Sequence, residues 1–195
     1  MQKLYLVLIL SALAALPILA ALHVSDKAPD FSAPASLGGK EFNFSLANAL
    51  KKGPVVVYFF PSAYTQGCDI EAHAFAQDKD KFDAAGATIV GISADSIDRL
   101  NVFAADPEFC AGKFAVASDP NRKIATSYDL KASSPSAGMK DARGAELHHD
   151  FIERVTFVVG KDHNIIARFS STEDKISPDQ HVKKSLEIVQ QLAHK

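Results

Sequence analysis

The sequence has no tryptophan and only two cysteines and two methionines. Two cysteines are too few for a disulfide-dense scaffold, a four-cysteine zinc site or an iron–sulfur cluster. Neither sign of charge dominates, since 21 Lys and Arg stand against 23 Asp and Glu for a formal net charge of -2. This balance excludes a basic nucleic-acid footprint as the main activity. With 47% hydrophobic and 23% charged residues among 195, the chain has the composition of one globular domain.

The amino terminus is expected to lie outside that domain. A single lysine precedes an apolar run from Leu4 to Val24, which is typical of an export signal and approaches the roughly 20 residues that span a bilayer. Residues 1–24 are therefore predicted to be a signal peptide or an N-terminal membrane anchor, with a possible tether through residues 4–24. Either alternative places the folded domain, residues 25–195, outside the cytoplasm as an exported protein, periplasmic or membrane-anchored.

Strands and helices are predicted to alternate after Ser25. Short apolar runs bounded by turn residues indicate strands, and apolar residues spaced by three and four indicate helices. The predicted strands are 55–60, 88–93, 114–117, 155–159 and 165–169, the last two forming a hairpin. The predicted helices are 67–85, 95–105, 121–128 and a final helix to about 193, with Ser177 as its N-cap and Pro178 in its first turn. This order predicts an α/β sandwich around a mixed central β-sheet flanked by helices.

One stretch has the chemistry of a reactive thiol. A buried strand ends near Phe60, a turn follows, and Cys68 falls in the first turn of the next helix. Free backbone N–H groups and the helix dipole favour an anion there, and a thiol reacts only as the thiolate. We therefore expect the pKa of Cys68 to be lowered, with the Thr65 hydroxyl beside the sulfur and Pro61 stiffening the turn. The alternative is a buried structural cysteine.

The same stretch resembles the active-site pattern of the peroxiredoxins, Pro61-x-x-x-Thr65-x-x-Cys68. Residues 65–75, TQGCDIEAHAF, are most similar to the Q-type, bacterioferritin comigratory protein-like branch. Four further segments match in the right order along the chain: 27–31 (KAPDF), 90–95 (VGISAD), 117–120 (ASDP) and 154–159 (RVTFVV). The resemblance implies a thioredoxin-like fold and a thiol-dependent peroxidase.

The resemblance also implies roles for individual residues. Cys68 would attack a peroxide, either hydrogen peroxide or an organic hydroperoxide, and become a sulfenic acid. Thr65 and Arg154 would hydrogen-bond the sulfur and the peroxide, and Pro61 would shield the site. A surface ion pair between Arg154 and Asp150 or Glu153 is the alternative for the arginine.

The second half of the cycle departs from the branch pattern. Many Q-type members carry a second cysteine where this chain has His73, which we expect to be a partly exposed helix residue. We expect Cys110, in a segment of Asp-Pro and Ala-Gly pairs, to resolve the sulfenic acid as an intramolecular disulfide. An inert Cys110 and a permanent structural disulfide remain open. The segment 131–150 looks longer than usual for the family; it is expected to be an irregular loop, with His148 and His149 solvated rather than metal ligands.

Other expectations complete the prediction. The resemblance implies a thioredoxin- or glutaredoxin-like reductant as partner, and we expect no metal, no cofactor, no nucleic-acid partner, and a monomer or weak dimer. One rival function is an exported thiol–disulfide oxidoreductase, which normally needs Cys-x-x-Cys, whereas Asp69, Ile70 and Glu71 follow Cys68. The other is a non-catalytic thioredoxin-fold binding module, in which Cys68 would be unreactive.

Overall fold

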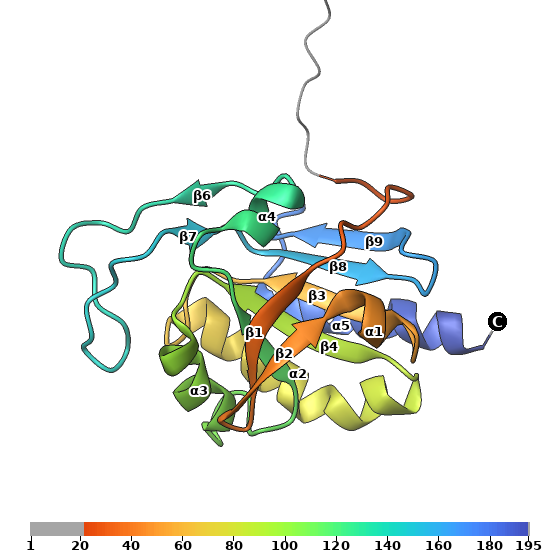
Figure 1. Ribbon diagram of the computed structural model, residues 1–195, viewed down its shortest axis with the longest axis horizontal. Coiled ribbons are helices and arrows are strands. Elements are labelled where there is room, and N and C mark those ends of the chain that lie inside the picture. Colours follow the sequence, from red (N-terminus) through yellow and green to blue (C-terminus); the bar gives the residue numbers. More distant parts are fainter. Residues whose placement is uncertain (1–21, 195) are drawn as a thin grey trace, which may run out of the picture.

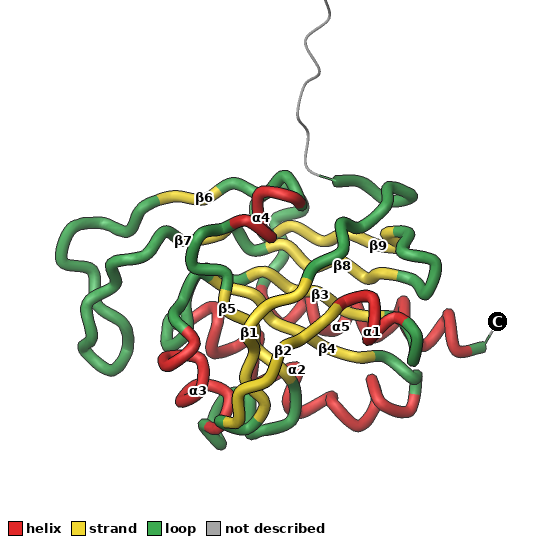
Figure 2. The backbone as a smooth tube through the Cα atoms, in the orientation of Figure 1, coloured by secondary structure: helices red, strands yellow, loops and turns green. Residues whose placement is uncertain are grey.

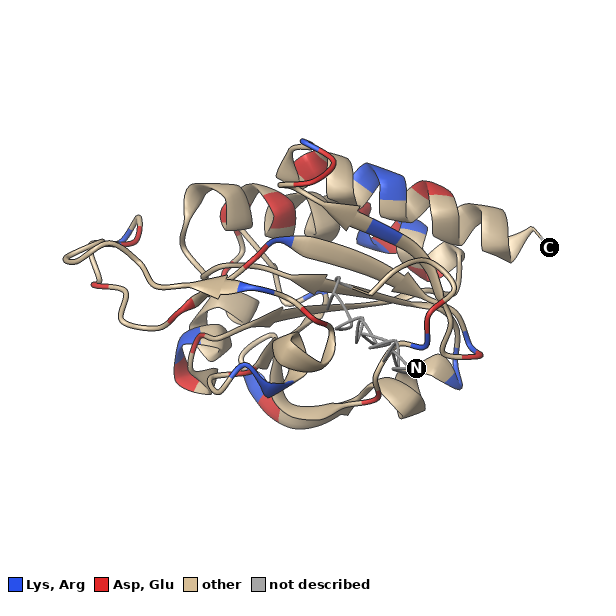
Figure 3. Ribbon diagram, turned by 90° about the horizontal axis from the view of Figure 1, so that it is seen from above, with Lys and Arg blue, Asp and Glu red and all other residues tan. Residues whose placement is uncertain are grey.

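The structure, a computed structural model, describes residues 22–194 as a mixed β-sheet between two layers of helices (Figure 1). The predicted signal or anchor lies mainly in residues 1–21, outside the described residues. Within residues 22–194, no helix is both long enough and apolar enough to cross a membrane. Positively and negatively charged residues alternate along α5 and around the loops (Figure 3), as the near-neutral composition indicates.

Helices lie on both sides of the strands (Figure 2), and from β3 to α4 strands and helices alternate along the chain. The strands are β1 (Ser32–Leu37), β2 (Lys40–Ser45), β3 (Val55–Phe59), β4 (Thr88–Ser93), β5 (Ala115–Ser118), β6 (Ala132–Ser133), β7 (Phe151–Ile152), β8 (Val155–Val159) and β9 (Ile165–Ser170). The helices are α1 (Leu46–Leu50), α2 (Gln66–Ala84), α3 (Ile97–Ala105), α4 (Lys123–Ser127) and α5 (Pro178–Ala193). Every predicted strand and helix is present, with small shifts at the ends.

The main sheet has the strand order β2-β1-β5-β4-β3-β8-β9. Strand β3 lies inside it, parallel to β4 and antiparallel to β8. Its residues are all buried because both faces are covered. Val57 and Phe59 face the layer that contains α1 and α4, whereas Val56 and Tyr58 face α2, α3 and α5. This confirms the predicted thioredoxin-like sandwich and places the carboxyl end of β3 directly before α2.

The sequence analysis did not predict the amino-terminal hairpin. Strands β1 and β2 pair antiparallel and join the sheet through a short pairing of β1 with β5, at Ala35 and Ser36. The run SAPASL has small residues and a proline instead of the β-branched residues that mark strands. Tertiary contacts rather than local propensity therefore form this edge.

The segment 131–150 is more ordered than predicted. Near its start, β6 pairs with β7, which directly follows the segment, and an isolated bridge joins Lys140 to Glu146. In Figure 1 the segment extends from one end of the body as a long arm. The chain that follows it enters β8, whose first residue, Val155, pairs with Phe59 at the carboxyl end of β3.

Candidate active site

The turn between β3 and α2 positions the candidate nucleophile. Strand β3 ends at Phe59, Thr65 is the N-cap of α2, and Cys68 lies in the first turn of that helix. The backbone N–H of Cys68 donates to the Thr65 carbonyl at 2.8 Å. Tyr64 has a φ of 59, a left-handed conformation that costs a non-glycine residue free energy and requires support from its surroundings. The predicted position of Cys68 is thus confirmed.

Two donors converge on the sulfur. Thr65 Oγ1 and Arg154 Nη2 each lie 3.1 Å from Cys68 Sγ. Thr65 Oγ1 also lies 2.8 Å from the Ser62 carbonyl. Because a hydroxyl has one proton, it donates to either the carbonyl or the sulfur at one time. Thr65 makes no side-chain capping bond to α2, so its hydroxyl is free for this role.

Antiparallel pairing brings Arg154 to this turn from far along the chain. Val155, the first residue of β8, pairs with Phe59, the last residue of β3, so the residue before β8 lies beside the start of α2. Gly67 leaves room for the guanidinium, since a Cβ there would lie 3.1 Å from Arg154 Nη2. Pro61 lies half-buried just after β3.

The alternative ion pair predicted for Arg154 is wrong. Its guanidinium is bound to Glu71, on α2 one turn after Cys68. Glu153 instead accepts the backbone N–H of Lys131, and Asp150 pairs with Arg122. One buried guanidinium therefore serves two acids, the Cys68 thiol through Nη2 and the Glu71 carboxyl through Nη1.

The expectation of a lowered thiol pKa is wrong for this closed conformation. Cys68 is only 1% exposed. Burial raises the pKa of the Cys68 thiol, because the thiolate loses its hydration. The charge of Arg154 and the hydrogen bond from Thr65 act in the opposite direction and lower that pKa. The thiolate therefore depends on these two residues to offset the burial.

Glu71 and His181 form a buried pair that the sequence analysis missed. Burial raises the pKa of Glu71 to about 7, although Arg154 opposes this shift. His181, on α5, has its Nδ1 3.9 Å from Glu71 Oε1. Burial and the Arg154 charge lower the pKa of His181 to about 4, so the imidazole is neutral at neutral pH. The spacing of three between Cys68 and Glu71 on one helix face is the signal that could have indicated Glu71.

Cys110, the other candidate, is a free thiol in the interior. It belongs to the same hydrophobic cluster as Cys68 and Tyr58. Burial, followed by the negative charges of Asp106 and Asp69, raises the pKa of Cys110 well above its ordinary value. Cys110 is therefore unreactive while its segment stays closed.

The segment around Cys110 is linked to the active-site turn. The Phe109 ring packs edge-on against Tyr64 with centroids 5.6 Å apart. His73, exposed on α2 as predicted, has Nδ1 2.8 Å from the Glu108 carbonyl and donates to it. Just after Cys110, Ala111 and Gly112 both have positive φ. The segment around Cys110 is thus packed against the turn through Phe109 and against α2 through His73.

The histidines of the 131–150 segment differ from expectation in one respect. His148 is exposed, as predicted. His149 is not a solvated loop residue, because its side chain is only 21% exposed and lies 2.8 Å from Asp95. Among the described residues, no group of three or more His, Cys, Asp or Glu side chains is arranged to hold a metal ion.

The fold and the site define a thioredoxin-like redox protein with a buried thiol at the start of α2, where no Cys-x-x-Cys pair is present. The AhpC/TSA family model matches residues 24–168. Chloroplastic peroxiredoxin Q of Sedum lineare is 30% identical over 142 residues, which are 73% of this chain and 66% of that protein. Peroxiredoxin Bcp of Escherichia coli is 28% identical over 144 residues, 74% of this chain and 83% of that protein.

Solved structures agree with these relatives. Peroxidoxin BcpB from Mycobacterium tuberculosis is similar with a TM-score of 0.68 and 26% identity, covering 85% of this chain and 95% of that one. The bacterioferritin comigratory protein of Xanthomonas campestris is similar with a TM-score of 0.62 and 27% identity, covering 82% and 91%. The chain belongs to the AhpC/TSA family of thiol peroxidases and is a peroxiredoxin of the Q-type, BCP-like branch.

Proposed function

We propose that Cys68 is the peroxidatic cysteine and that it reduces hydrogen peroxide and organic hydroperoxides. The observation that carries this is the convergence of Thr65 Oγ1 and Arg154 Nη2 on Cys68 Sγ, each at 3.1 Å. The solved Xanthomonas campestris relative is titled for its alkyl peroxide reduction activity, which supports hydroperoxides with an organic group as substrates. The test is peroxide consumption by the purified chain and its cysteine variants.

The chemistry follows from these contacts. The Cys68 thiolate attacks one peroxide oxygen, the O–O bond breaks, and the leaving oxygen takes a proton to depart as water or an alcohol. Cys68 becomes a sulfenic acid. Arg154 stays charged at all relevant pH and faces the oxygens on which negative charge develops. Thr65 turns its single proton toward the sulfur or the peroxide, with Ser62 as the alternative acceptor.

Access of a peroxide to Cys68 requires movement of the turn between β3 and α2. Cys68 is 1% exposed, and it does not line either of two prominent surface cavities of the described residues, of ≈ 440 and ≈ 380 Å³. A peroxide therefore reaches the sulfur when residues 61–65 move away from it. Pro61 at the start of this turn limits the movement, because its ring fixes φ.

We further propose that Cys110 resolves the sulfenic acid. Its thiol attacks the Cys68 sulfur, water leaves, and an intramolecular disulfide forms. A dithiol protein of the thioredoxin or glutaredoxin class then reduces this disulfide by thiol exchange. Both cysteines start buried and unbonded, and we expect the first turn of α2 and the segment around Cys110 to open together. The coupling of Tyr64 to Phe109 supports a joint movement.

We expect Cys110→Ser to separate the two halves of the cycle. The variant should reduce one equivalent of peroxide at a rate close to that of the wild type, because Cys110 touches neither Thr65 nor Arg154. Recycling by a dithiol protein should fall at least about tenfold, since no intramolecular disulfide forms. Mass spectrometry after one equivalent of peroxide should show a sulfenic acid in the variant and a disulfide in the wild type. Unchanged steady-state recycling in Cys110→Ser would show that Cys110 is inert.

We also propose that the protein is exported and works outside the cytoplasm as a monomer or weak dimer. The support is the apolar run from Leu4 to Val24 in the sequence. Expressed in full in a bacterium, the chain should fractionate with the periplasm or the inner membrane, and accessibility to an impermeant protease should follow outer-membrane permeabilisation. A matched chain that lacks residues 1–24 should stay in the cytosol. Recovery of the full chain in the cytosol would contradict export.

A further inference from the structure

The arm of residues 131–150 is fastened to the active-site turn. The backbone N–H of Ala142 donates to the Tyr64 carbonyl at 2.9 Å. The Arg143 guanidinium carbon lies 3.5 Å from the centroid of the Tyr64 ring, close enough for a cation–π interaction. Tyr64 is the residue held at a positive φ between β3 and α2. The arm thus supports the strained point of the turn.

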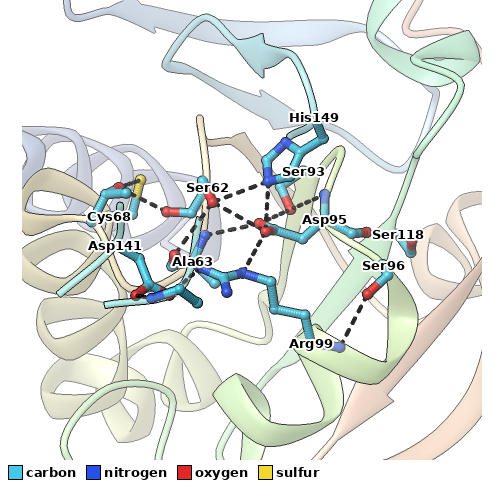
Figure 4. A network of polar contacts seen from close by, with 12 residues as sticks. Ser62, Ala63, Cys68, Ser93, Asp95, Ser96, Arg99, Ser118, Asp141 and His149 are labelled. Atoms are coloured by element: carbon cyan, nitrogen blue, oxygen red, sulfur yellow. Dashed lines mark hydrogen bonds and ion pairs between the residues drawn. The ribbon is translucent and has the colours of Figure 1, made fainter. Parts of the chain in front are cut away.

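A network of charged side chains also joins the arm to the turn (Figure 4). Arg99, from α3, binds Asp95 through Nε at 2.8 Å and Asp141 of the arm through Nη2 at 2.7 Å. Both carboxylate side chains are fully buried. Arg99 Nη2 also donates to the Ala63 carbonyl at 2.7 Å. One guanidinium therefore joins the arm, the end of β4 and the active-site turn.

Asp95 binds the turn directly. Its Oδ2 accepts the backbone N–H of Ala63 at 2.8 Å, and its Oδ1 accepts the Ser62 hydroxyl at 3.0 Å. Ser62 is also the residue whose carbonyl competes with Cys68 for the Thr65 proton. The position of Asp95 is therefore transmitted to Thr65 through two adjacent residues.

His149 completes this cluster from the arm. Its Nε2 lies 2.8 Å from Asp95 Oδ1, and its Nδ1 lies 3.0 Å from the Asp150 carbonyl. Both ring nitrogens face oxygen acceptors, so the ring satisfies both contacts only when it is doubly protonated. The charges agree with this, because Asp95 and Asp141 carry two negative charges and Arg99 supplies one positive charge. A His149 imidazolium neutralises the cluster.

The arrangement is not a nucleophile–base relay, although it holds a serine, a histidine and an aspartate. Ser62 Oγ and Asp95 Oδ1 both approach the same His149 nitrogen, Nε2, at 3.1 and 2.8 Å. A base that activates a hydroxyl uses one nitrogen for the hydroxyl and the other for the carboxylate. The cluster therefore holds position and does not perform acyl transfer.

We propose that His149 is a positioning residue of the peroxidase. When it is protonated, His149 holds the 131–150 arm against the active-site turn, and when it loses its proton, that turn is released. We call this contact between His149 and Asp95 the latch. This inference rests on the proposed role of Cys68. With the latch closed, Ser62 and Thr65 are held in their positions beside the Cys68 sulfur. With the latch open, the turn unwinds more readily and Cys68 can travel toward Cys110.

The direction of the pH effect follows from the surroundings of His149. Burial disfavours its charge, yet the hydrogen bond and the charge of Asp95 outweigh this and raise the pKa of His149 above its ordinary value. Arg99 opposes the shift. A group whose pKa is higher in the folded than in the unfolded protein stabilises its contact fully at pH values below its unfolded-state pKa, roughly 6.5 for histidine. This stabilisation is lost as the pH rises through the folded-state pKa. The latch should therefore open on the alkaline side.

The remaining charges near the cluster do not change this direction. Arg143 stays protonated throughout. Burial raises the pKa of Asp69, on α2 near Asp141 and Arg99, to about 6. Asp69 therefore becomes negatively charged at a lower pH than that at which His149 loses its proton. The negative charge of Asp69 favours the protonated form of His149. Arg122 forms an ion pair at 2.6 Å with Asp150, the residue after His149, so the charge of that carboxylate is balanced.

The test is hydrogen exchange of the reduced full chain from pH 6 to 9, with rates corrected for intrinsic exchange. The probes are the amides of Ala63 and Ala142, which are hydrogen-bonded to Asp95 and Tyr64. In the wild type, protection at both should fall roughly tenfold as pH rises and His149 loses its charge. His149→Gln should show low protection that does not change with pH. His148→Gln is the matched control, because His148 directly precedes His149 and its side chain is 80% exposed. This variant should show the same pH dependence as the wild type.

The outcomes separate this inference from the proposed function, because exchange needs no peroxide. If wild-type protection at Ala63 and Ala142 does not fall with pH, or if His149→Gln keeps the wild-type dependence, the latch is wrong. Oxidation by one equivalent of peroxide gives the functional readout: disulfide formation should be faster in His149→Gln than in the wild type at pH 6 and similar at pH 9. Absence of peroxide reduction with a pH-dependent latch would overturn only the role of Cys68.

Discussion

Cys68→Ser should abolish peroxide reduction. The serine oxygen can occupy the place of the sulfur between Thr65 and Arg154, but a hydroxyl is not ionised by these two donors at neutral pH, and an alkoxide is needed to attack the O–O bond. We expect the second-order rate constant with hydrogen peroxide to fall at least about a thousandfold, to that of protein without a reactive thiol. The measurement is peroxide loss under single-turnover conditions with the purified full chain.

Cys110→Ser is the matched control for this result, because it removes the other thiol from the same hydrophobic cluster. It should keep the first turnover while Cys68→Ser loses it. Peroxide consumption that survives in Cys68→Ser and disappears in Cys110→Ser would reverse the roles of the cysteines. Consumption that is absent in the wild type as well, with disulfide exchange activity present, would favour a thiol–disulfide oxidoreductase.

The local pattern around Cys68 predicts most of the site because it is contiguous in sequence. A continuous apolar strand, a turn with Pro61 and a helix that begins after Thr65 require only neighbouring residues to be read correctly. The continuous apolar run along β3 also predicts a strand covered on both faces, which the two core clusters confirm. Arg154 was identified only through the family resemblance; its contact with the sulfur depends on the register of β8 against β3.

The other parts of the site depend on tertiary contacts that leave little trace in the sequence. Glu71 looks like any exposed acidic helix residue until β8 brings Arg154 against it. His149 lies in a polar segment without periodicity, so a solvated loop is the natural prediction. Its burial follows from Asp95, which is more than fifty residues earlier. The sequence predicts the wrong direction for the pKa shift of Cys68. The position at a helix N-terminus suggests a stabilised thiolate, whereas the burial that raises the pKa is known only from the fold.

Arg154 and Glu71 allow the electrostatics of the sulfur to be changed in both directions. Arg154→Leu removes the positive charge and one hydrogen bond from a buried thiol, so burial is opposed chiefly by the hydrogen bond from Thr65. The pKa of Cys68 should rise further, and the rate with peroxide should fall roughly a hundred- to a thousandfold, as for the loss of one preorganised donor. Arg154→Lys should recover only part of this rate, because an ammonium cannot present two parallel N–H groups to Cys68 and Glu71.

Glu71→Gln should act in the opposite direction on the thiol. The wild-type carboxyl, with a pKa raised by burial to about 7, ionises as pH rises and then competes with the thiolate for the one guanidinium. Glutamine keeps an oxygen acceptor for Arg154 but removes the negative charge, so the pKa of Cys68 should fall. The pH–rate profile of peroxide reduction, which rises with the thiolate fraction, should shift to lower pH in Glu71→Gln and to higher pH in Arg154→Leu.

A matched change on the same helix tests whether this shift is specific. Asp78→Asn removes a carboxylate that pairs with Lys81 on α2, away from the sulfur, and should leave the profile where the wild type has it. If Glu71→Gln leaves the profile unmoved, Glu71 and Cys68 do not share the Arg154 charge. A parallel shift in Asp78→Asn would show that overall charge, rather than the shared guanidinium, sets the ionisation of the thiol.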